Sequence, residues 1–347
     1  MRFSVPFAEL QRQLAEQFSV SLLHPVAPPS GSTNFVVLFD DYVARVHSPA
    51  QAYRTEAYVQ VEVAVLDALE AAAFAGVPRV LATQGAGEKL FRWRYGEACG
   101  HGLLMTRLPG RSLPPCRVRA LAVAAMLARL HQTLLGAHAP FRTPAAIDEA
   151  LAARSQKECV REEDICAAAR RVRDLLVDRH PFAHETNARI VAVFDILLLD
   201  AERALLADQA SAAVRGIVHL DLNSSNWLWH ENQEGVEIPG LVDFDFCAPG
   251  VLLLDISYCL VEWCIDWAKE PKDLQDFLDA YSSHRPMAPG ERALLPHFFG
   301  VMWLKTLSWV FGQSHWSIKP LMEYGHVLLR RIDTTRNLLL RTINGDV

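Results

Sequence analysis

The stretch VHLDLNSSNWLW (residues 218–229) decides the fold, because it places a histidine, an aspartate and an asparagine just ahead of a strand-like run. Asn226 directly precedes the run WLWH, turn-forming residues follow, and a second strand-like run, IPGLV, ends just before Asp243. In an antiparallel hairpin the residue before the first strand and the residue after the second are neighbours, with Cα atoms about 5 Å apart. We therefore predict a β-hairpin that brings Asn226 and Asp243 face to face.

The side chains at the base of this hairpin carry hard oxygen ligands. A carboxylate beside a carboxamide oxygen suits Mg²⁺, which keeps several waters and takes its remaining ligands from phosphate groups. Asp221, on the same loop as Asn226, is placed to orient a hydroxyl group and to accept its proton during phosphoryl transfer. His219 is expected to brace the loop backbone. The alternative is an ordinary hairpin, since Asn, Ser and Asp are also common turn formers.

The overall composition limits the class of protein. The chain has 347 residues, 51% of them hydrophobic and 21% charged, which is enough for a large core in about two lobes. The net charge of −6, without a dense run of Lys and Arg, argues against nucleic acid as a partner. Seven cysteines without a C-x-x-C pair indicate neither a disulfide framework nor a zinc site, and they fit a reducing cytoplasm.

The sequence predicts neither a signal peptide nor a membrane span. Residues 1–18 carry acids and glutamines where a signal peptide has its apolar core. Residues 294–312 are apolar, but Pro296, His297 and Lys305 interrupt them, and a lysine in the middle of a bilayer is costly. We expect a buried helix there, and a cytoplasmic protein.

The pattern of apolar residues changes near residue 108. Before it lie a helical segment (7–18), a β-like hairpin (35–47), a helix with apolar spacing (56–74) and a strand-like run (103–108). After it, helical patterns dominate except in the region 217–245. We predict an α+β fold with a small N-terminal lobe over residues 1–107 and a larger, mostly helical lobe over residues 108–347.

These motifs resemble a known family. H-L-D-L-N-S-S-N (219–226) followed by V-D-F-D (242–245) is similar to the catalytic and metal-binding loops of protein-kinase-like small-molecule kinases, the aminoglycoside phosphotransferase and choline kinase superfamily. The glycine common between the family's His and Asp is Leu220 here. The resemblance extends over most of the chain. It implies a bilobal protein-kinase-like fold, ATP and Mg²⁺ in the cleft, and transfer of the γ-phosphoryl group to the hydroxyl of a small molecule.

The resemblance assigns nucleotide-binding roles in the N-terminal lobe. The segment SGSTN (30–34) looks like the loop that covers the nucleotide, through Ser32, Thr33 and Asn34. Arg45 occupies the place of the basic residue that holds the α- and β-phosphates, where lysine is frequent in the family. Glu62 matches the ion-pair partner of that basic residue, and Glu56 on the same helix is the competing candidate.

The segment LLMTRLPG (103–110) resembles the strand and linker on which adenine rests. The resemblance places Met105 on this strand and gives adenine its hydrogen bonds to backbone groups near Thr106 and Leu108. Leu228, between two tryptophans, is expected to form the apolar floor of the same pocket.

The helix VLLLDISYCLVEWCIDWAKEP (251–271) is the expected acceptor site. Its spacing places Asp255, Glu262 and Asp266 on one helical face, and the resemblance assigns Asp255 to bracing the catalytic loop. Carboxylates and aromatic faces together suit an ammonium group, and the pattern is similar to the acceptor helix of choline and ethanolamine kinases. The expected acceptor residues are Glu262, Trp263, Asp266, Trp267 and Trp303. The alternatives are core packing for the tryptophans and a salt bridge for Glu262, while Asp245 either supports the metal loop or is polar surface.

Other functions stay open on the sequence. An aminoglycoside or homoserine is an alternative acceptor within the same superfamily. A nucleotide-binding pseudokinase or interaction module would keep the fold without turnover. His219 and Asp221 with a distant histidine would also suit a non-haem iron site, but such oxygenases need a β-sandwich and the chain after residue 250 is helical in pattern.

Overall fold

The structure is a computed structural model, and it describes residues 6–27, 35–47, 55–85, 87–136, 139–154, 162–179, 184–208, 213–312 and 318–345. The predicted nucleotide loop, with Ser32, Thr33 and Asn34, lies outside these ranges.

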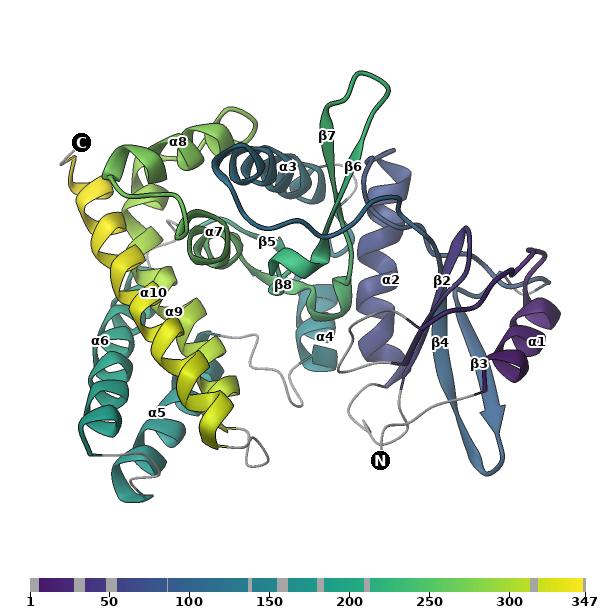
Figure 1. Ribbon diagram of the computed structural model, residues 1–347, viewed down its shortest axis with the longest axis horizontal. Coiled ribbons are helices and arrows are strands. Elements are labelled where there is room, and N and C mark those ends of the chain that lie inside the picture. The colour runs from purple at the N-terminus through teal and green to yellow at the C-terminus, as the bar shows by residue number, and fades with distance from the viewer. Residues whose placement is uncertain are drawn as a thin grey trace.

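The N-terminal part is built on a four-stranded antiparallel sheet with the strand order β1-β2-β4-β3 (Figure 1). The strands are β1 (Phe35–Leu38), β2 (Tyr42–Val46), β3 (Leu90–Tyr95) and β4 (Ala98–Thr106). Phe35 pairs with Val46, and Asp40 and Asp41 form the turn between β1 and β2. The predicted hairpin at 35–47 is confirmed, whereas the sequence pattern did not indicate β3.

A helix covers each face of this sheet. On one face, α1 (Phe7–Gln17) buries Leu10 and Leu14, one turn apart, against aromatic residues of β3. On the other face lies α2 (Glu56–Ala71), which begins after Thr55; the Thr55 hydroxyl accepts a hydrogen bond from a backbone amide of the first turn. The apolar residues of α2 belong to the core that continues into the helical part, so α2 lies between the sheet and the remaining helices (Figure 1).

The larger part of the molecule is mostly helical. Its α-helices are α3 (Arg117–Leu135), α4 (Pro144–Arg154), α5 (Glu162–Arg179), α6 (His184–Asp208), α7 (Leu253–Cys259), α8 (Pro271–Ser282), α9 (Pro289–Gly312) and α10 (Ile318–Asn344). Two antiparallel ribbons lie among them: β5 (Arg215–Val218) with β8 (Ala248–Val251), and β6 (Trp227–Glu231) with β7 (Glu237–Leu241). A small antiparallel sheet followed by a mostly helical part confirms the predicted fold class, and the lobe boundary at residues 107 and 108 stays a prediction.

The linker after β4 is tied to the β6–β7 hairpin. The backbone amide of Arg111 donates to the carbonyl of Trp229 over 3.1 Å, and the reverse bond is 2.9 Å long. Gly110 makes this close approach feasible, because it has a φ of 106° and a Cβ atom there would lie 2.4 Å from the Trp229 carbonyl oxygen. The hairpin that carries the predicted site is therefore fixed to the linker between the two parts.

The apolar segment at 294–312 lies within α9, and its central side chains, such as Leu295 and Phe298, are fully buried. Among the described residues, α3 is long and apolar enough to cross a membrane by length and composition, but half of its most apolar window is buried inside the protein. Because core helices meet the same criterion, this is a weak indication of a span.

Candidate active site

The carboxylate of Asp221 is held by two asparagine side chains. The Asn223 amide donates to one carboxylate oxygen over 2.8 Å, and the Asn226 amide donates to the other over 2.9 Å. The same Asn226 nitrogen also donates to the backbone carbonyl of Asp221 over 2.8 Å. The amide oxygen of Asn226 accepts no hydrogen bond from the described residues, which leaves it as a candidate metal ligand. Sequence reasoning missed Asn223, which lies two residues after Asp221.

A buried aspartate on α7 fixes the backbone on the other side of Asp221. The carboxylate of Asp255 accepts hydrogen bonds from the amides of His219 (2.7 Å) and Leu220 (2.9 Å). Leu220 has a φ of 63°, so a leucine adopts the left-handed conformation at the place where the family usually has glycine. Asp255 also contacts His131 of α3 over 3.1 Å. The predicted bracing residue therefore lies where it can hold a strained turn.

His219 links the loop to the strand end opposite it. Its Nδ1 accepts from the Asp221 amide over 3.3 Å, so its Nε2 carries the proton and donates to the Val242 carbonyl over 3.2 Å. Its ring packs edge-on against Phe244, with 4.7 Å between ring centroids. The structure thus places the histidine in backbone contacts, as the sequence predicts.

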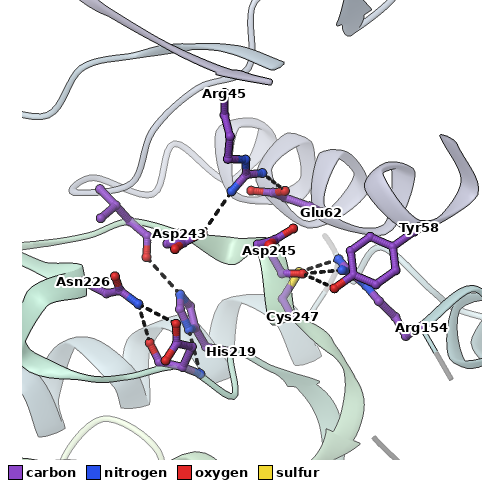
Figure 2. A network of polar contacts seen from close by, with 11 residues as sticks. Arg45, Tyr58, Glu62, Arg154, His219, Asn226, Asp243, Asp245 and Cys247 are labelled. Atoms are coloured by element: carbon purple, nitrogen blue, oxygen red, sulfur yellow. Dashed lines mark hydrogen bonds and ion pairs between the residues drawn. The ribbon is translucent and has the colours of Figure 1, made fainter. Parts of the chain in front are cut away.

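The β6–β7 hairpin brings Asn226 and Asp243 to the same end. The residue opposite Asn226 is Val242, one residue before the predicted Asp243. Trp227 pairs with Leu241, so the carbonyl of Asn226 accepts from the amide of Val242 over 3.0 Å. Asp243 is the next residue and has a φ of 64° at the start of a 3₁₀ turn, η2 (Phe244–Phe246). Figure 2 shows the Asn226 and Asp243 side chains on the same side of the His219 ring.

Arg45 of β2 connects the sheet to α2 and to this hairpin (Figure 2). Its guanidinium forms an ion pair with Glu62 of α2 and a second one with Asp243 over 3.0 Å. Arg45 and Glu62 are buried, whereas the Asp243 side chain is 41% exposed. Glu56, the competing partner, instead lies 3.4 Å from Arg92 at the surface. Glu62 is therefore the residue that pairs with Arg45.

The cluster around Arg45 carries an excess of negative charge. Burial raises the pKa of Glu62 to about 7, because Arg45 offsets the cost of its charge only in part and Asp245 and Asp243 add to it. Desolvation by the surrounding protein also raises the pKa of Asp243, although part of its side chain is exposed; Arg45 opposes this shift, and Asp245 and Asp221 reinforce it. A divalent cation would relieve this repulsion.

The oxygen donors at this site fit a magnesium ion. Asn226 and Asp243 offer a carboxamide oxygen and a partly exposed carboxylate, which are hard ligands. In the described part of the chain no three His, Cys, Asp or Glu side chains form a metal cluster. An ion held here would take its remaining ligands from water and phosphate, in keeping with the sequence prediction.

The structure brings some residues of the expected adenine pocket close together. Leu228 pairs with Gly240 in the β6–β7 ladder, and the Leu108 side chain lies over Gly240, so the two predicted leucines are close to each other. Met105 is buried. The backbone amide of Thr106 already donates to the Arg79 carbonyl over 2.9 Å, so Thr106 cannot offer this amide to a nucleotide.

The predicted acceptor helix is not a continuous α-helix. After α7 the chain forms a π-helix, η3 (Leu260–Cys264), which has a wider turn and changes the phase of the residues that follow. The expectation that Asp255, Glu262 and Asp266 share one helical face is therefore corrected. Asp266 lies at the surface in an ion pair with Arg331, 3.0 Å away.

The other predicted acceptor residues lie at different depths. Glu262 accepts a hydrogen bond from the Ser224 amide over 2.9 Å, which puts it in contact with the loop that carries Asp221. Trp263 is fully buried and its indole donates to the Leu222 carbonyl over 3.1 Å, and Trp303 is buried beside Tyr258. Neither of these two rings is open to a ligand. Trp267 is half-buried and donates to the Trp263 carbonyl over 2.6 Å, and acceptor contacts by Glu262 and Trp267 stay predictions.

Comparison with known proteins gives matches over most of the chain. A family model described as "Phosphotransferase enzyme family" matches residues 25–295. Homoserine kinase from Methylobacillus glycogenes is 31% identical over 134 residues, which span 37% of this chain and 39% of that protein. The chain thus covers about two fifths of the length of this curated relative.

Solved structures resemble the whole molecule. An aminoglycoside phosphotransferase from Alicyclobacillus acidocaldarius has a TM-score of 0.65 at 14% identity and covers 99% of this chain and 98% of its own. A microcompartment-associated aminopropanol kinase has a TM-score of 0.60 at 18% identity, with 97% of each chain covered. These identities are low, so the likeness shows the fold alone, and it confirms the protein-kinase-like architecture.

Proposed function

The chain belongs to the phosphotransferase enzyme family, and from this premise we propose that it transfers the γ-phosphoryl group of ATP to a hydroxyl group of a small molecule, with Mg²⁺ as cofactor. The observation that carries the proposal is the arrangement at the hairpin base. There the Asp221 carboxylate is fixed by Asn223 and Asn226, while Asp243 lies between Asn226 and the Arg45–Glu62 pair.

The acceptor hydroxyl would lie against Asp221. This carboxylate orients the hydroxyl group and accepts its proton as the new O–P bond forms and the bond to the leaving ADP oxygen breaks. Two amide donors hold the carboxylate in one orientation, so little reorganisation is needed during the reaction.

The nucleotide would lie between the sheet and the hairpin. Arg45 is placed to balance phosphate charge, and Glu62 keeps the guanidinium in position. Asn226 and Asp243 would hold Mg²⁺, and the ion would supply positive charge to offset the charge of the phosphates. Leu108 and Leu228 would pack against adenine from the linker and the hairpin.

We propose a small cationic amino alcohol as the acceptor. Glu262 is a half-buried carboxylate next to the catalytic loop, and one of its oxygens is used by the Ser224 amide, which leaves the other for an ammonium group. Homoserine and aminopropanol, which name two of the similar proteins, each carry an amino group and a hydroxyl group. Ethanolamine and choline belong to the same chemical class, and an aminoglycoside is the larger alternative.

A coupled assay of ADP release tests the proposal. The purified protein would be given Mg²⁺–ATP, or Mg²⁺–GTP in a parallel series, with ethanolamine, choline, aminopropanol, homoserine or kanamycin. We expect acceptor-dependent ADP release with at least one small amino alcohol. Nucleotide binding without release for any acceptor would instead indicate a binding module, and turnover with kanamycin alone would overturn the proposed acceptor class.

A further inference from the structure

The backbone carbonyl of Asp245, two residues after the proposed metal ligand Asp243, accepts two hydrogen bonds. One comes from the hydroxyl of Tyr58 on α2, over 3.0 Å, and the other from the guanidinium of Arg154 at the end of α4 (Figure 2). Both lone pairs of this carbonyl are thereby used, so the peptide that closes η2 is held from two directions. Because Asp243 begins that turn in a left-handed conformation, the orientation of its carboxylate depends on how the turn is held.

Arg154 is an unusual residue to find at this depth. Its side chain is 1% exposed, its guanidinium carbon lies 3.9 Å from the centre of the Tyr58 ring, and its second terminal nitrogen is 3.7 Å from the Cys247 sulfur. Among the described residues its direct partners are thus a carbonyl, a ring face and a thiol, with no carboxylate in hydrogen-bond contact. A buried guanidinium in such surroundings is costly to folding, which suggests a role beyond packing.

The charged groups around Arg154 indicate what this role is. Three carboxylates, those of Glu62, Asp243 and Asp245, interact with Arg45, while Glu62 and Asp245 also interact with Arg154. Two guanidiniums therefore face three carboxylates at the place where we propose Mg²⁺ to bind.

We infer that Arg154 is a positioning residue for the proposed metal site: through the Asp245 carbonyl and the Tyr58 ring it locks η2 against α2, so that Asp243 and Glu62 keep their places around Arg45. This rests on the proposed function. Lysine can replace the guanidinium only in part, because a planar group is needed to stack on Tyr58 while separate N–H groups reach the carbonyl and the thiol. α4 is therefore part of the catalytic framework, although it contributes no residue that touches the substrate.

The test is the Mg²⁺ dependence of nucleotide binding, measured by calorimetry with a non-hydrolysable ATP analogue over a range of Mg²⁺ concentrations. We expect Arg154→Met to raise the half-saturating Mg²⁺ concentration by about tenfold and Arg154→Lys by about threefold. Tyr58→Phe keeps the ring, removes the hydroxyl bond to the same carbonyl, and should raise it by about twofold to threefold. The matched control is Arg170→Lys on α5, where the arginine is in a surface ion pair with Glu202.

The outcomes separate the inference from the proposed function. If the Arg154 variants melt at a lower temperature but respond to Mg²⁺ as the wild type does, Arg154 is a packing residue and the inference is wrong. If the Arg154 variants do not fold, the Tyr58→Phe response decides in the same way. Absence of Mg²⁺-dependent nucleotide binding in the wild type would instead overturn the proposed function, and the inference would fail with it.

Discussion

At the scale of single residues, Asp221 makes the sharpest prediction. Asp221→Asn replaces a carboxylate oxygen by an amide nitrogen, which must then face an amide donor of Asn223 or Asn226. The side chain also loses its ability to accept a proton. We expect kcat to fall about 10²-fold to 10⁴-fold, with the affinity for Mg²⁺–nucleotide nearly unchanged. Steady-state kinetics and calorimetry check this, with the exposed Glu234→Gln on the same hairpin as control. Normal turnover would remove Asp221 from the mechanism.

Glu62 makes a prediction about pH. Its pKa of about 7 in the metal-free protein means that it is mostly protonated at pH 6. A divalent cation bound near Asp243 favours the ionised form, so binding should release protons at pH 6, and Mg²⁺–nucleotide affinity should rise with pH up to about 7 and then level off.

Calorimetry in buffers of different ionisation enthalpy measures these protons. Glu62→Gln should release fewer of them at pH 6 than the wild type, because it removes the carboxyl group whose pKa is about 7. At pH 8 the two proteins should behave alike. Equal proton release at pH 6 would show that Glu62 is already ionised before the cation binds.

Residue types and spacing were enough to predict some of the site and not the rest. Asn226 and Asp243 flank the strands of one short hairpin and Asp221 lies in the loop just before it, so local geometry brings them together. The register was off by one because β7 ends at Leu241 and Asp243 turns into a left-handed conformation. The role of Arg154 could not be predicted, because it lies 91 residues before Asp245 in the chain and α4 carries no pattern that indicates a contact there.

At the scale of secondary structure, the π-helix after α7 explains why the acceptor prediction was only partly met. The spacing rule assumes 3.6 residues per turn, and η3 departs from it at Leu260. Periodicity cannot reveal such a departure, because the sequence before and after it is equally apolar. Glu262 contacts the loop that carries Asp221 through the Ser224 amide, whereas Trp263 is buried in the core.

Glu262→Gln separates a binding role from a supporting role. A glutamine oxygen can still accept the hydrogen bond from the Ser224 amide, so a purely supporting Glu262 would tolerate the change. If Glu262 also binds an ammonium group, loss of its charge should raise KM for the amino alcohol about tenfold or more and leave KM for ATP unchanged. The neutral control is Asp266→Asn, at the surface pair with Arg331. An unaltered acceptor KM would contradict the cationic-acceptor proposal.

The linker between the two parts makes a prediction about stability. Gly110→Ala forces a Cβ atom against the Trp229 carbonyl, so it should open the backbone bridge between Arg111 and Trp229. Gly96→Ala is the matched control, because Gly96 also has a positive φ (59°) but has open space around its Cβ position. The control should cost about 1 kcal/mol of unfolding free energy from backbone strain alone. Urea denaturation should show a larger loss of unfolding free energy for Gly110→Ala than for Gly96→Ala. Equal losses would mean that the linker accommodates the added Cβ atom at no cost beyond backbone strain.

At the scale of the whole molecule, the sequence predicted the class of fold and the order of its parts. The hairpin at 35–47 and the helix of α2 have strong local patterns, and the loop at 218–229 fixes the family. The packing of α4 against α2 and β8, and of α5 and α6 against α9, could not be predicted, because a helical pattern shows which face is buried without showing which neighbour covers it. The separate core between α1 and the sheet was likewise not indicated.

The proposed nucleotide site draws on both parts, with Arg45 on the sheet and Asn226 and Asp243 on the hairpin, so bound nucleotide should stabilise the protein as a unit. At a concentration about 100 times Kd, a ligand adds about 2.7 kcal/mol of unfolding free energy. The entropy of unfolding scales with chain length, so for 347 residues this gain in unfolding free energy raises Tm by about 4 °C.

The part of this rise that depends on Mg²⁺ should disappear in Asp243→Asn, because the carboxylate is the charged metal ligand at the site. Thermal melts of the wild type and the variant, each with an ATP analogue and either Mg²⁺ or EDTA, measure that part directly. Asp333→Asn, at an exposed position on α10, is the control and should keep the full difference. An Mg²⁺-dependent rise that survives in Asp243→Asn would place the metal elsewhere, and Asp221 would then need a different partner to align the phosphate with the acceptor.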